Sequence, residues 1–258
     1  MTRNLMYALI SDIHSNTEAL EVCLGEIDRL GVERILCLGD VIGYGPEPRA
    51  TLLRVMDVAE FSLLGNHEHG AMFYASDFNP KARAAIDWTR DQLNRRDDAE
   101  AREQNMRMWN YLGDMKERCE EDDVVFVHGS PKDPIRDYVV PKDAREPGAM
   151  AERFAKMNGA KLCFVGHSHV PGVYPEAGGF VRPDDTNGVY RVGGDRAIVN
   201  IGSVGQPRDG DPRASFVTFD GEAVAFHRLP YDHERTMAKI RAVPELPDYL
   251  ADRLAQGR

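Results

Sequence analysis

The sequence predicts an α/β (α+β) fold in which short buried strands alternate with helices. Apolar runs recur along the chain, and nearly every one ends abruptly in Gly, Asp, His or Asn, which is the pattern of strands buried on both faces. The strand, helix, strand order at the start favours a largely parallel sheet, with reactive groups just beyond the carboxyl ends of its strands. The predicted strands are Met6–Ile10, Arg34–Leu38, Phe61–Leu64, Val124–Val127, Lys161–Val165 and Ala197–Ile201.

The first helix is predicted over residues 15–30, where apolar side chains recur on one helical face. Ser15 and Glu18 have the spacing of a capping box at its start. Gly31 is a natural stop for this helix. The first two strands are therefore expected to be joined by a helical crossover.

A helical, charged segment is predicted over about 70–122, with helices at Pro80–Leu93 and Ala99–Arg118. We interpret it as helices packed on or over the core of the protein. Trp88 and Trp109 are expected to anchor these helices rather than to stack on a ligand.

The last third of the chain changes to short alternating runs after Pro171. Asp220-Gly221 separates two such runs, Ser215–Phe219 and Ala223–Phe226, and predicts a β-hairpin. From His233 onward the sequence predicts two short helices, broken around two prolines.

Composition and charge exclude several classes of function. The chain has 258 residues, of which 42% are hydrophobic, and can bury a sizeable core. Its formal net charge is −10 and its Lys and Arg residues form no block, so we expect neither duplex nucleic acid nor an anionic membrane as a partner. An anionic substrate would therefore need a strong local positive charge.

The amino-terminal apolar run and the cysteines favour a cytoplasmic protein. Leu5–Ile10 is far too short to span a bilayer, and no signal-peptide cleavage pattern follows it. Cys23, Cys37, Cys119 and Cys163 include no C-x-x-C pair, so we expect reduced thiols, with a disulfide as the alternative.

Polar side chains follow five of the predicted strands. Residues Asp12 and His14 are separated by one residue, so a chain that stays extended would project them to the same side. His167 and His169 have the same spacing, which is typical of a metal site. The full set also includes Asp40, Asn66, His67 and His128.

Each of these residues has an ordinary structural explanation when it is considered alone. Asp40 could cap a turn, Asn66 and His67 could belong to a turn, and His128 could be a satisfied buried histidine. Taken together, however, they place Asp, Asn or His at five strand ends and supply two complete sets of metal ligands. The other histidines, His69, His227 and His233, are then expected at the surface.

The ordered motifs Asp-x-His, Gly-Asp, Gly-Asn-His-Glu, a single His and Gly-His-x-His resemble the calcineurin-like metallophosphoesterase superfamily. Within it, Gly39–Pro46, His128–Pro131 and Gly202–Arg208 resemble the small prokaryotic phosphodiesterase-like branch. The resemblance runs the whole length and implies one domain over 1–258. It implies a four-layer αββα sandwich with two mixed sheets and a two-metal site at the strand ends.

The resemblance also implies roles for individual residues. Asp40 would bridge two metals, and His67 would donate a proton to the leaving oxygen while a metal-bridging hydroxide attacks. Imidazoles with hard oxygens suit Mn, Fe or Zn. One metal would be held by Asp12, His14, Asp40 and His169, the other by Asp40, Asn66, His128 and His167.

Some positions differ from the motifs of better-known members of this superfamily, and these differences concern the substrate. Ser/Thr protein phosphatases carry Arg before Gly-Asn-His-Glu and Asp-Arg after Gly-Asp, whereas this chain has Leu64 and Gly43-Tyr44 there. Phosphate contacts could instead come from Arg208 or Arg136, although both could be plain surface residues. We therefore predict a phosphodiesterase that acts on a small phosphoester or nucleotide substrate.

Other functions stay open at this point. The same two-metal chemistry permits a phosphomonoesterase, a protein phosphatase or a dinucleoside polyphosphate hydrolase. Some members of this fold are protein-binding scaffolds that tend to lose the catalytic histidine, but His67 is present here. The sequence leaves the oligomeric state open.

Overall fold

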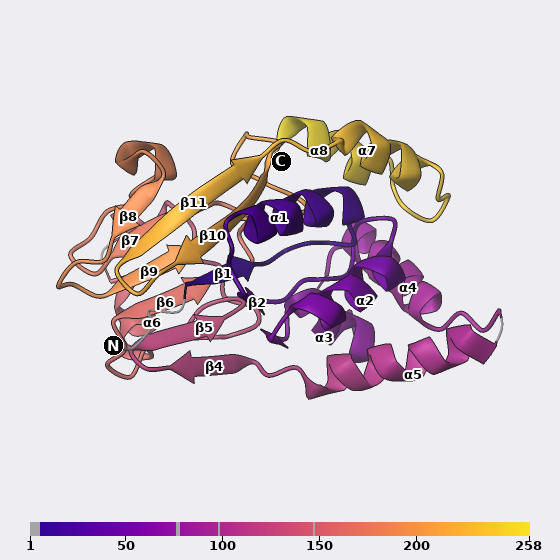
Figure 1. Ribbon diagram of the computed structural model, residues 1–258, viewed down its shortest axis with the longest axis horizontal. Helices are drawn as coiled ribbons and strands as arrows, with labels where there is room; N and C mark the ends of the chain where they lie inside the picture. Colours follow the sequence, from indigo (N-terminus) through magenta and orange to yellow (C-terminus); the bar gives the residue numbers. More distant parts are fainter. Residues whose placement is uncertain (1–5, 76–77, 98, 147) are drawn as a thin grey trace.

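The strands form two mixed sheets that pack face to face (Figure 1). The computed structural model describes residues 6–75, 78–97, 99–146 and 148–258. The first sheet has the order β3-β2-β1-β10-β11-β8 and the second the order β4-β5-β6-β9-β7. The first sheet comprises β1 (Tyr7–Ile10), β2 (Arg34–Cys37), β3 (Phe61–Ser62), β8 (Val189–Arg191), β10 (Ala214–Phe219) and β11 (Ala223–Leu229). The second comprises β4 (Arg118–Glu121), β5 (Val124–Val127), β6 (Leu162–Val165), β7 (Gly172–Pro175) and β9 (Ala197–Asn200).

The expectation of a largely parallel sheet is wrong, because fewer than half of the strand pairs in the described residues are parallel. β1 pairs in parallel with β2, β2 with β3, β5 with β6 and β6 with β9, while the remaining pairs are antiparallel. The expectation of two mixed sheets is therefore confirmed. The hairpin around Asp220-Gly221 is also confirmed, because β10 and β11 pair in antiparallel register on either side of it.

One buried hydrophobic core lies between the sheets. Leu9 of β1 and Leu36 of β2 belong to the same buried cluster as Phe126 of β5 and Phe164 of β6. Each sheet therefore buries one face against the other. The opposite faces are covered by helices or loops, as expected for strands without polar alternation.

Helices cover the outer face of the first sheet. These are α1 (Thr17–Arg29) and α2 (Pro48–Val58), and α7 (His233–Arg241) packs against α1. Leu20 and Ile27 of α1 and Leu52 of α2 share a cluster with Ala8 and Ile10 of β1. The helical crossover predicted between the first two strands is confirmed.

The outer face of the second sheet has a thinner cover. It consists of α6 (Ala151–Ala155), the 3₁₀ helix η1 (Asp143–Arg145) and loops, while a second 3₁₀ helix, η2 (Pro183–Thr186), precedes β8. Phe154 and Met157 pack there against Val127 and Val165.

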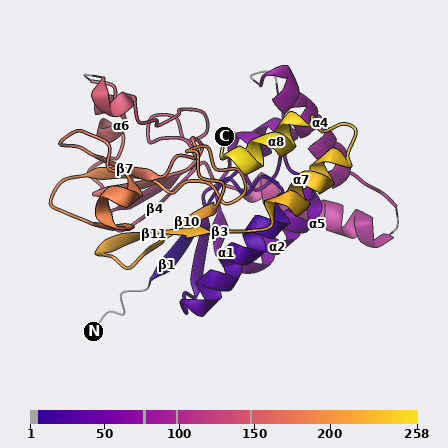
Figure 2. The same ribbon diagram turned by 90° about the horizontal axis from the view of Figure 1, so that it is seen from above.

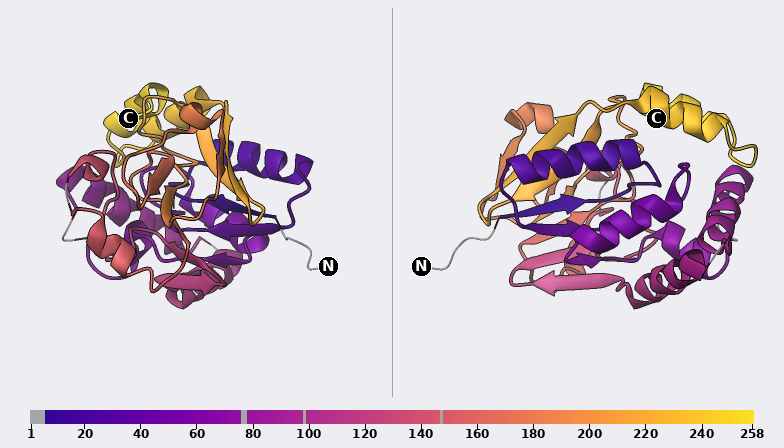
Figure 3. Two further views of the ribbon diagram at one scale, coloured as in Figure 1. Left: turned by 90° about the vertical axis from the view of Figure 1, so that its left-hand side faces the viewer. Right: turned by 45° about the vertical axis from the view of Figure 1, so that its right-hand side comes forward.

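The predicted helical segment forms one end of the molecule, beyond the strand ends (Figure 3). It contains α4 (Pro80–Leu93) and α5 (Ala99–Asp114), which contact α2, and the end of α3 (Asn66–Met72), which contacts both α4 and α5. The last helix, α8 (Tyr249–Gln256), packs with α7 and α4 on the same side of the molecule (Figure 2).

Both tryptophans act as the helix anchors that the sequence predicts. Trp88 is buried in the cluster between α4, α7 and α8. Trp109 packs against the main helical cluster, and its indole N–H donates to Asn94 at 3.1 Å.

Two predicted helix boundaries are wrong. The first helix is capped by Asn16, whose side chain accepts from the Ala19 N–H at 3.2 Å, and not by Ser15, whose φ of 55° takes it out of the capping conformation. Glu18 instead binds Lys239 of α7. The helix predicted to end at Arg118 ends earlier, because Arg118 begins strand β4.

Two further observations concern the cysteines and the lengths of the helices. All four cysteines are free, and Cys23, Cys37 and Cys163 are buried. Within the described ranges no helix is both long and apolar enough to cross a bilayer.

Candidate metal centre

The seven predicted ligands lie together at one edge of the two sheets. Five strands deliver them: β1, β2 and β3 of one sheet, and β5 and β6 of the other. Six of the seven side chains are buried, and Asn66, the first residue of α3, is half-buried. Ligation itself stays a prediction, but the structure assembles Asp12, His14, Asp40, Asn66, His128, His167 and His169 in one place.

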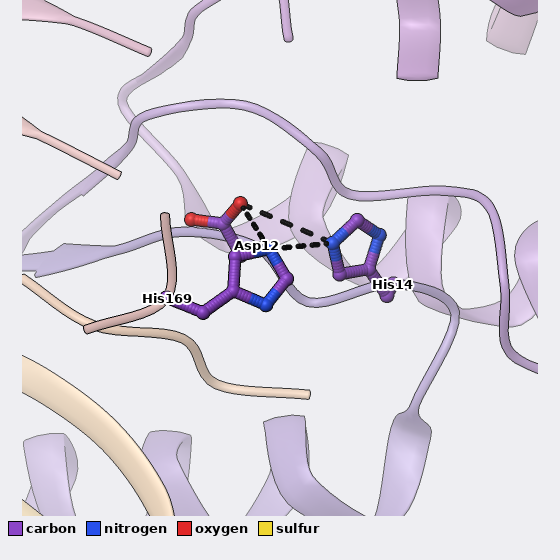
Figure 4. Close-up of side chains that lie close together, drawn as sticks. All are labelled: Asp12, His14 and His169. Atoms are coloured by element: carbon purple, nitrogen blue, oxygen red, sulfur yellow. Dashed lines mark hydrogen bonds and ion pairs between the residues drawn. The ribbon is translucent and has the colours of Figure 1, made fainter. Parts of the chain in front are cut away.

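One half of the centre contains Asp12, His14 and His169 (Figure 4). The His169 Nε2 atom lies 3.0 Å from Asp12 Oδ1 and 3.2 Å from His14 Nε2. His14 Nε2 is 3.9 Å from the same carboxylate oxygen. Three potential ligand atoms therefore converge on one point.

The other half contains Asn66, His128 and His167. His128 Nε2 lies 3.1 Å from Asn66 Oδ1 and 3.1 Å from His167 Nδ1. Asp40 lies between the halves, since its Oδ2 atom is 3.4 Å from His128 Nε2 and 3.8 Å from His14 Nε2. This position is the one that a bridging ligand requires.

The outer nitrogen of each imidazole faces a backbone carbonyl oxygen. The Nδ1 atoms of His14, His128 and His169 face the carbonyls of Ile42, Leu38 and Gln206, respectively. His167 is turned the other way, so that Nε2 faces the carbonyl of Arg136 and Nδ1 faces the centre. Because a carbonyl only accepts, each outer nitrogen must donate, which leaves a lone pair on each inner nitrogen.

The inner nitrogen atoms of the four imidazoles lie in two close couples, and the lone pairs within each couple are directed at one another. His14 Nε2 and His169 Nε2 are 3.2 Å apart, and His128 Nε2 and His167 Nδ1 are 3.1 Å apart. Asp12 Oδ1 is buried without a hydrogen-bond partner in the described part of the chain. Clustered acceptors of this kind need a proton or a cation between them, so the donor set fits two metal ions.

Burial and the neighbouring charged groups shift the pKa values of the residues in the centre. Burial lowers the pKa of His167 to about 3, and burial together with the charge of His67 holds the pKa of His14 well below its usual range. Burial also opposes a charge on His128, but the Asp40 carboxylate prevails and raises its pKa to about 9. Nearby imidazoles lower the pKa of Asp12 and Asp40 despite their burial. The carboxylates thus stay ionised and can balance metal charge.

The convergence of these ligands does not come from an extended chain. Asp12 has a φ of 54° and His14 a φ of 50°, so the predicted same-side projection along a strand is wrong. Asp40, His167 and His169 are left-handed as well. Such conformations cost about 1–3 kcal/mol each in non-glycine residues and cluster at functional sites.

Hydrogen bonds between neighbouring loops hold this backbone in place. The Asp12 and His14 N–H groups donate to the carbonyls of Gly39 and Asp40, both at 3.0 Å. The two carboxylates also accept from other loops: His67 N–H donates to Asp40 at 2.9 Å and His167 N–H donates to Asp12 at 3.0 Å. Each loop therefore orients ligands of another.

His67 lies beside the predicted ligands. Its ring is buried, with the ring of Tyr44 at 4.3 Å and that of His14 at 4.7 Å between centroids. Burial lowers its pKa to about 4. Its Nδ1 atom has no hydrogen-bond partner in the described residues. The structure thus places an uncommitted imidazole at the centre.

Glu68 is a functional residue that the sequence reasoning missed. Its buried carboxylate accepts from the N–H groups of Asp40 at 2.8 Å, Ile42 at 3.1 Å and Gly65 at 3.1 Å. It therefore fixes the loop that carries Asp40. Its place as the last residue of Gly-Asn-His-Glu, in the first turn of α3, could have indicated this role.

A cleft of about 230 Å³ opens beside the centre. The predicted ligands Asn66 and His167 line it, and Tyr138 stacks on His167 with 3.6 Å between ring centroids. His69, which was expected at the surface, is half-buried and lines this cleft. The other aromatic side chains of the cleft are Tyr44, Tyr74 and Phe78.

The remaining histidines are not fully exposed either. His227 is half-buried and stacks on Phe216 with 4.5 Å between centroids, and His233 is half-buried beside Tyr231. Burial lowers the pKa of His227. Neither histidine belongs to the centre.

The two predicted substrate-binding arginines lie near the centre. Arg136 is exposed at the cleft, with Nη2 3.4 Å from His69 Nδ1. Arg208 is half-buried, and its Cζ atom lies 5.8 Å from the centroid of the Tyr44 ring. Their contact with a substrate stays a prediction.

A comparison with known protein families identifies the family of this chain. Residues 5–223 match the model of the calcineurin-like phosphoesterase superfamily domain. The chain is 34% identical to an uncharacterized protein of Methanocaldococcus jannaschii, with 98% of both sequences covered. It also resembles the crystal structure of a metallophosphoesterase from Sphaerobacter thermophilus, at 39% identity, a TM-score of 0.82 and coverage of 98% of this chain and 99% of the other. A hypothetical protein of Pyrococcus horikoshii has the same fold, at 19% identity, a TM-score of 0.73 and 98% coverage of both chains.

Proposed function

The chain belongs to the calcineurin-like phosphoesterase superfamily, and from this premise we propose that it is a phosphodiesterase that hydrolyses small or nucleotide phosphoesters with two metal ions. The observation that carries the proposal is the pair of ligand sets that share Asp40, with the uncommitted imidazole of His67 beside them. Two ligand sets that share a carboxylate are suited to a pair of metal ions that act in phosphoryl transfer. A single structural ion would need only one such set.

The metal ions, when bound, would supply Lewis acidity toward the phosphoryl oxygens and lower the pKa of water. Asp12, His14, Asp40 and His169 would hold one of them, and Asp40, Asn66, His128 and His167 the other. Mn, Fe or Zn suits these nitrogen and oxygen ligands, and the absence of a cysteine from the set disfavours a structural zinc.

The protein's own residues would complete the chemistry. The carbonyls behind the four imidazoles keep their lone pairs directed at the centre, and Glu68 fixes the loop of Asp40. His67 would donate a proton to the leaving oxygen, since its ring is buried beside the centre and its Nδ1 atom has no hydrogen-bond partner among the described residues. Such general acid catalysis contributes about 10² to 10⁴ in rate.

The cleft supports a small or nucleotide substrate. Its aromatic side chains offer planar apolar surfaces to which a nucleobase or another aryl group could stack. The positions at which protein phosphatases carry their phosphate-binding arginines hold Leu64, which is buried, and Gly43-Tyr44. We therefore favour a diester or nucleotide over a phosphoprotein, and a cytoplasmic location with reduced thiols.

The decisive experiment compares the Mn²⁺-supported rates on bis-p-nitrophenyl phosphate and p-nitrophenyl phosphate, with the His67→Ala variant as the control. Faster diester cleavage that collapses in the variant supports a phosphodiesterase. Faster monoester cleavage would contradict it and favour a phosphomonoesterase. The absence of turnover on either ester would count against the proposal and favour the scaffold function or a dinucleoside polyphosphate substrate.

A further inference from the structure

Tyr138 is an exposed aromatic side chain on the wall of the cleft beside the centre. Its ring stacks on the imidazole of His167, with 3.6 Å between centroids and 26° between the ring planes. His167 is buried, so Tyr138 covers a predicted metal ligand, yet Tyr138 itself is 47% exposed. In the described part of the chain it makes no other ring contact. Much of the ring surface that lines the cleft is therefore available to a ligand.

A buried arginine holds the backbone that carries this ring. Arg153 of α6 donates from Nε to Asp137 Oδ2 at 2.6 Å and from Nη2 to Asp137 Oδ1 at 3.1 Å. The same Nη2 atom donates to the carbonyl of Tyr138 at 2.8 Å. The Ser130 hydroxyl donates to Asp137 Oδ2 at 2.6 Å. Because paired bonds between guanidinium and carboxylate are strong and directional, they fix the segment in one place.

The same segment also orients the predicted metal ligand. The carbonyl of Arg136 faces His167 Nε2 at 3.2 Å, and the ring of Tyr138 covers one face of that imidazole. The position of the Tyr138 ring is thus fixed relative to the centre. An exposed ring that is held rigidly can bind a partner at a lower entropic cost than a mobile side chain.

The size and the lining of the cleft favour a single planar group. Tyr44, Tyr74 and Phe78 line it as well, and Tyr74 is 84% exposed. Its volume of about 230 Å³ is below the roughly 300–1,000 Å³ of pockets for drug-sized ligands. Since the predicted ligands Asn66 and His167 line the same cleft, a phosphoryl group at the centre would direct its ester group into it.

We propose that Tyr138 is a specificity-determining residue, whose ring stacks on an aromatic group carried by the phosphoester. The substrate class is then an aryl or nucleoside phosphoester rather than the ester of an aliphatic alcohol. This inference rests on the proposed function and narrows it. Offset stacking between aromatic rings supplies affinity that a saturated group of similar size does not gain.

Calorimetry on the Mn²⁺-loaded protein tests the stacking, with phenylphosphonate and methylphosphonate as probes. Both carry the same phosphonate group and resist hydrolysis because a carbon atom is bound to phosphorus, so their difference reports the aromatic ring. We expect the parent to bind phenylphosphonate about tenfold more tightly. Tyr138→Leu should raise the dissociation constant of phenylphosphonate about tenfold and that of methylphosphonate less than about twofold. Tyr138→Phe, which keeps the ring, should behave like the parent.

A matched control and a second variant make the test specific. Tyr249→Leu removes a tyrosine of α8 that is also 47% exposed but does not line the cleft, and should change neither affinity. The metal content of each variant is measured by mass spectrometry. If Tyr138→Leu loses Mn²⁺ because His167 is uncovered, Tyr138→Trp decides, since its larger ring should keep the preference for phenylphosphonate.

Three outcomes would overturn the proposal. The first is equal affinity of the parent for the two phosphonates. The second is an affinity ratio in Mn²⁺-loaded Tyr138→Leu that stays within twofold of the parent ratio, or a preference that is lost in Tyr138→Trp. The third is an equal fall of the ratio in Tyr138→Phe and Tyr138→Leu, because the hydroxyl group and not the ring would then make the contact.

The hydrolysis of bis-p-nitrophenyl phosphate separates this inference from the proposed function. Turnover of this ester by a parent protein that binds both phosphonates equally overturns the stacking role alone. A preference for phenylphosphonate that depends on the Tyr138 ring, without turnover of the ester, supports the stacking role and overturns the phosphodiesterase.

Discussion

Gly43 lies directly against the imidazole of His67. A Cβ atom added to Gly43 would stand 2.1 Å from His67 Nδ1, and the φ of Gly43 is 89°, a conformation that side chains rarely adopt. The Gly43-Tyr44 pair that departs from the protein phosphatase pattern therefore has a local structural role. It leaves room for His67 and places the Tyr44 ring beside it.

Gly43→Ala should displace His67 and lower turnover while the metals stay bound. The added methyl group cannot be accommodated without movement of the imidazole, and no predicted ligand is touched directly. Metal content by mass spectrometry and the rate on bis-p-nitrophenyl phosphate measure the two effects. Gly113→Ala is the matched control, since Gly113 is exposed on α5 with no atom within 4 Å of the added carbon. A variant with the parent rate would contradict the close contact.

His67→Ala should keep the metals and lose turnover. Because His67 is predicted to protonate the leaving oxygen, the loss should reach about 10² to 10⁴ for esters with poor leaving groups and be smaller for p-nitrophenyl esters. Rates on a series of diesters with leaving groups of increasing basicity measure this dependence. Near-normal activity on the ester with the most basic leaving group would disprove the role.

Asp40→Ala should lose metal. The carboxylate faces both halves of the centre and also accepts the His67 N–H, so its removal deprives both predicted metals of a ligand and frees the start of α3. Metal stoichiometry after dialysis is the measurement. Asp123→Ala, at an exposed carboxylate that pairs with Lys161, is the control. Full occupancy in Asp40→Ala would contradict the bridging position.

Glu68→Gln should weaken metal binding although Glu68 touches no predicted metal. One carboxylate accepts three backbone N–H groups, and the amide of Gln would turn donors toward some of them. We expect an affinity loss of about 10–100-fold, as is typical of residues behind metal ligands. Titration of the metal-free variant with Mn²⁺ measures it. An Mn²⁺ affinity equal to that of the parent protein would contradict the prediction, because the Asp40 loop would then keep its conformation without the Glu68 carboxylate.

Acid should weaken the contact between α1 and α7. Burial acts to raise the pKa of Glu18, but hydrogen bonds from Lys239, the Glu18 backbone and Thr236 outweigh it, so the pKa is lowered. A carboxyl group whose pKa is lowered on folding stabilises the folded state at pH values above its pKa in the unfolded chain. This stabilisation is lost as the pH falls through the pKa of the group in the folded protein. The contribution is at most about 1 kcal/mol, because Glu18 is partly solvated.

The difference in unfolding free energy between the parent and Glu18→Gln measures this contribution. Urea denaturation should show a larger difference at pH 7 than at pH 3.5. Glu21→Gln, on the exposed face of the same helix and paired with Arg54, is the control. An equal difference at both pH values would contradict the prediction.

The sequence by itself determined most of the strands and most of the helices, and it predicted the residues of the centre. Runs such as Val124–Val127 are buried on both faces, and such burial is readable from the chain because it depends on local composition. The polar residue after each strand was readable for the same reason. His14 and His169 are 155 residues apart and follow strands of different sheets. The rule that parallel strands end at one edge gathers the ligands of each sheet, and the packing of the two sheets brings the two groups together.

The tertiary structure decided how these residues face one another. The left-handed backbone of Asp12 and His14 depends on hydrogen bonds to a neighbouring loop, and Asn16 replaces Ser15 as the helix cap because Ser15 belongs to that loop. Glu68 had only its place in the Gly-Asn-His-Glu motif as a local signal of its role. Its contacts with the Asp40 loop join segments distant in sequence, and hydrophobic periodicity reports only which side of an element is buried, not which side chain it will meet.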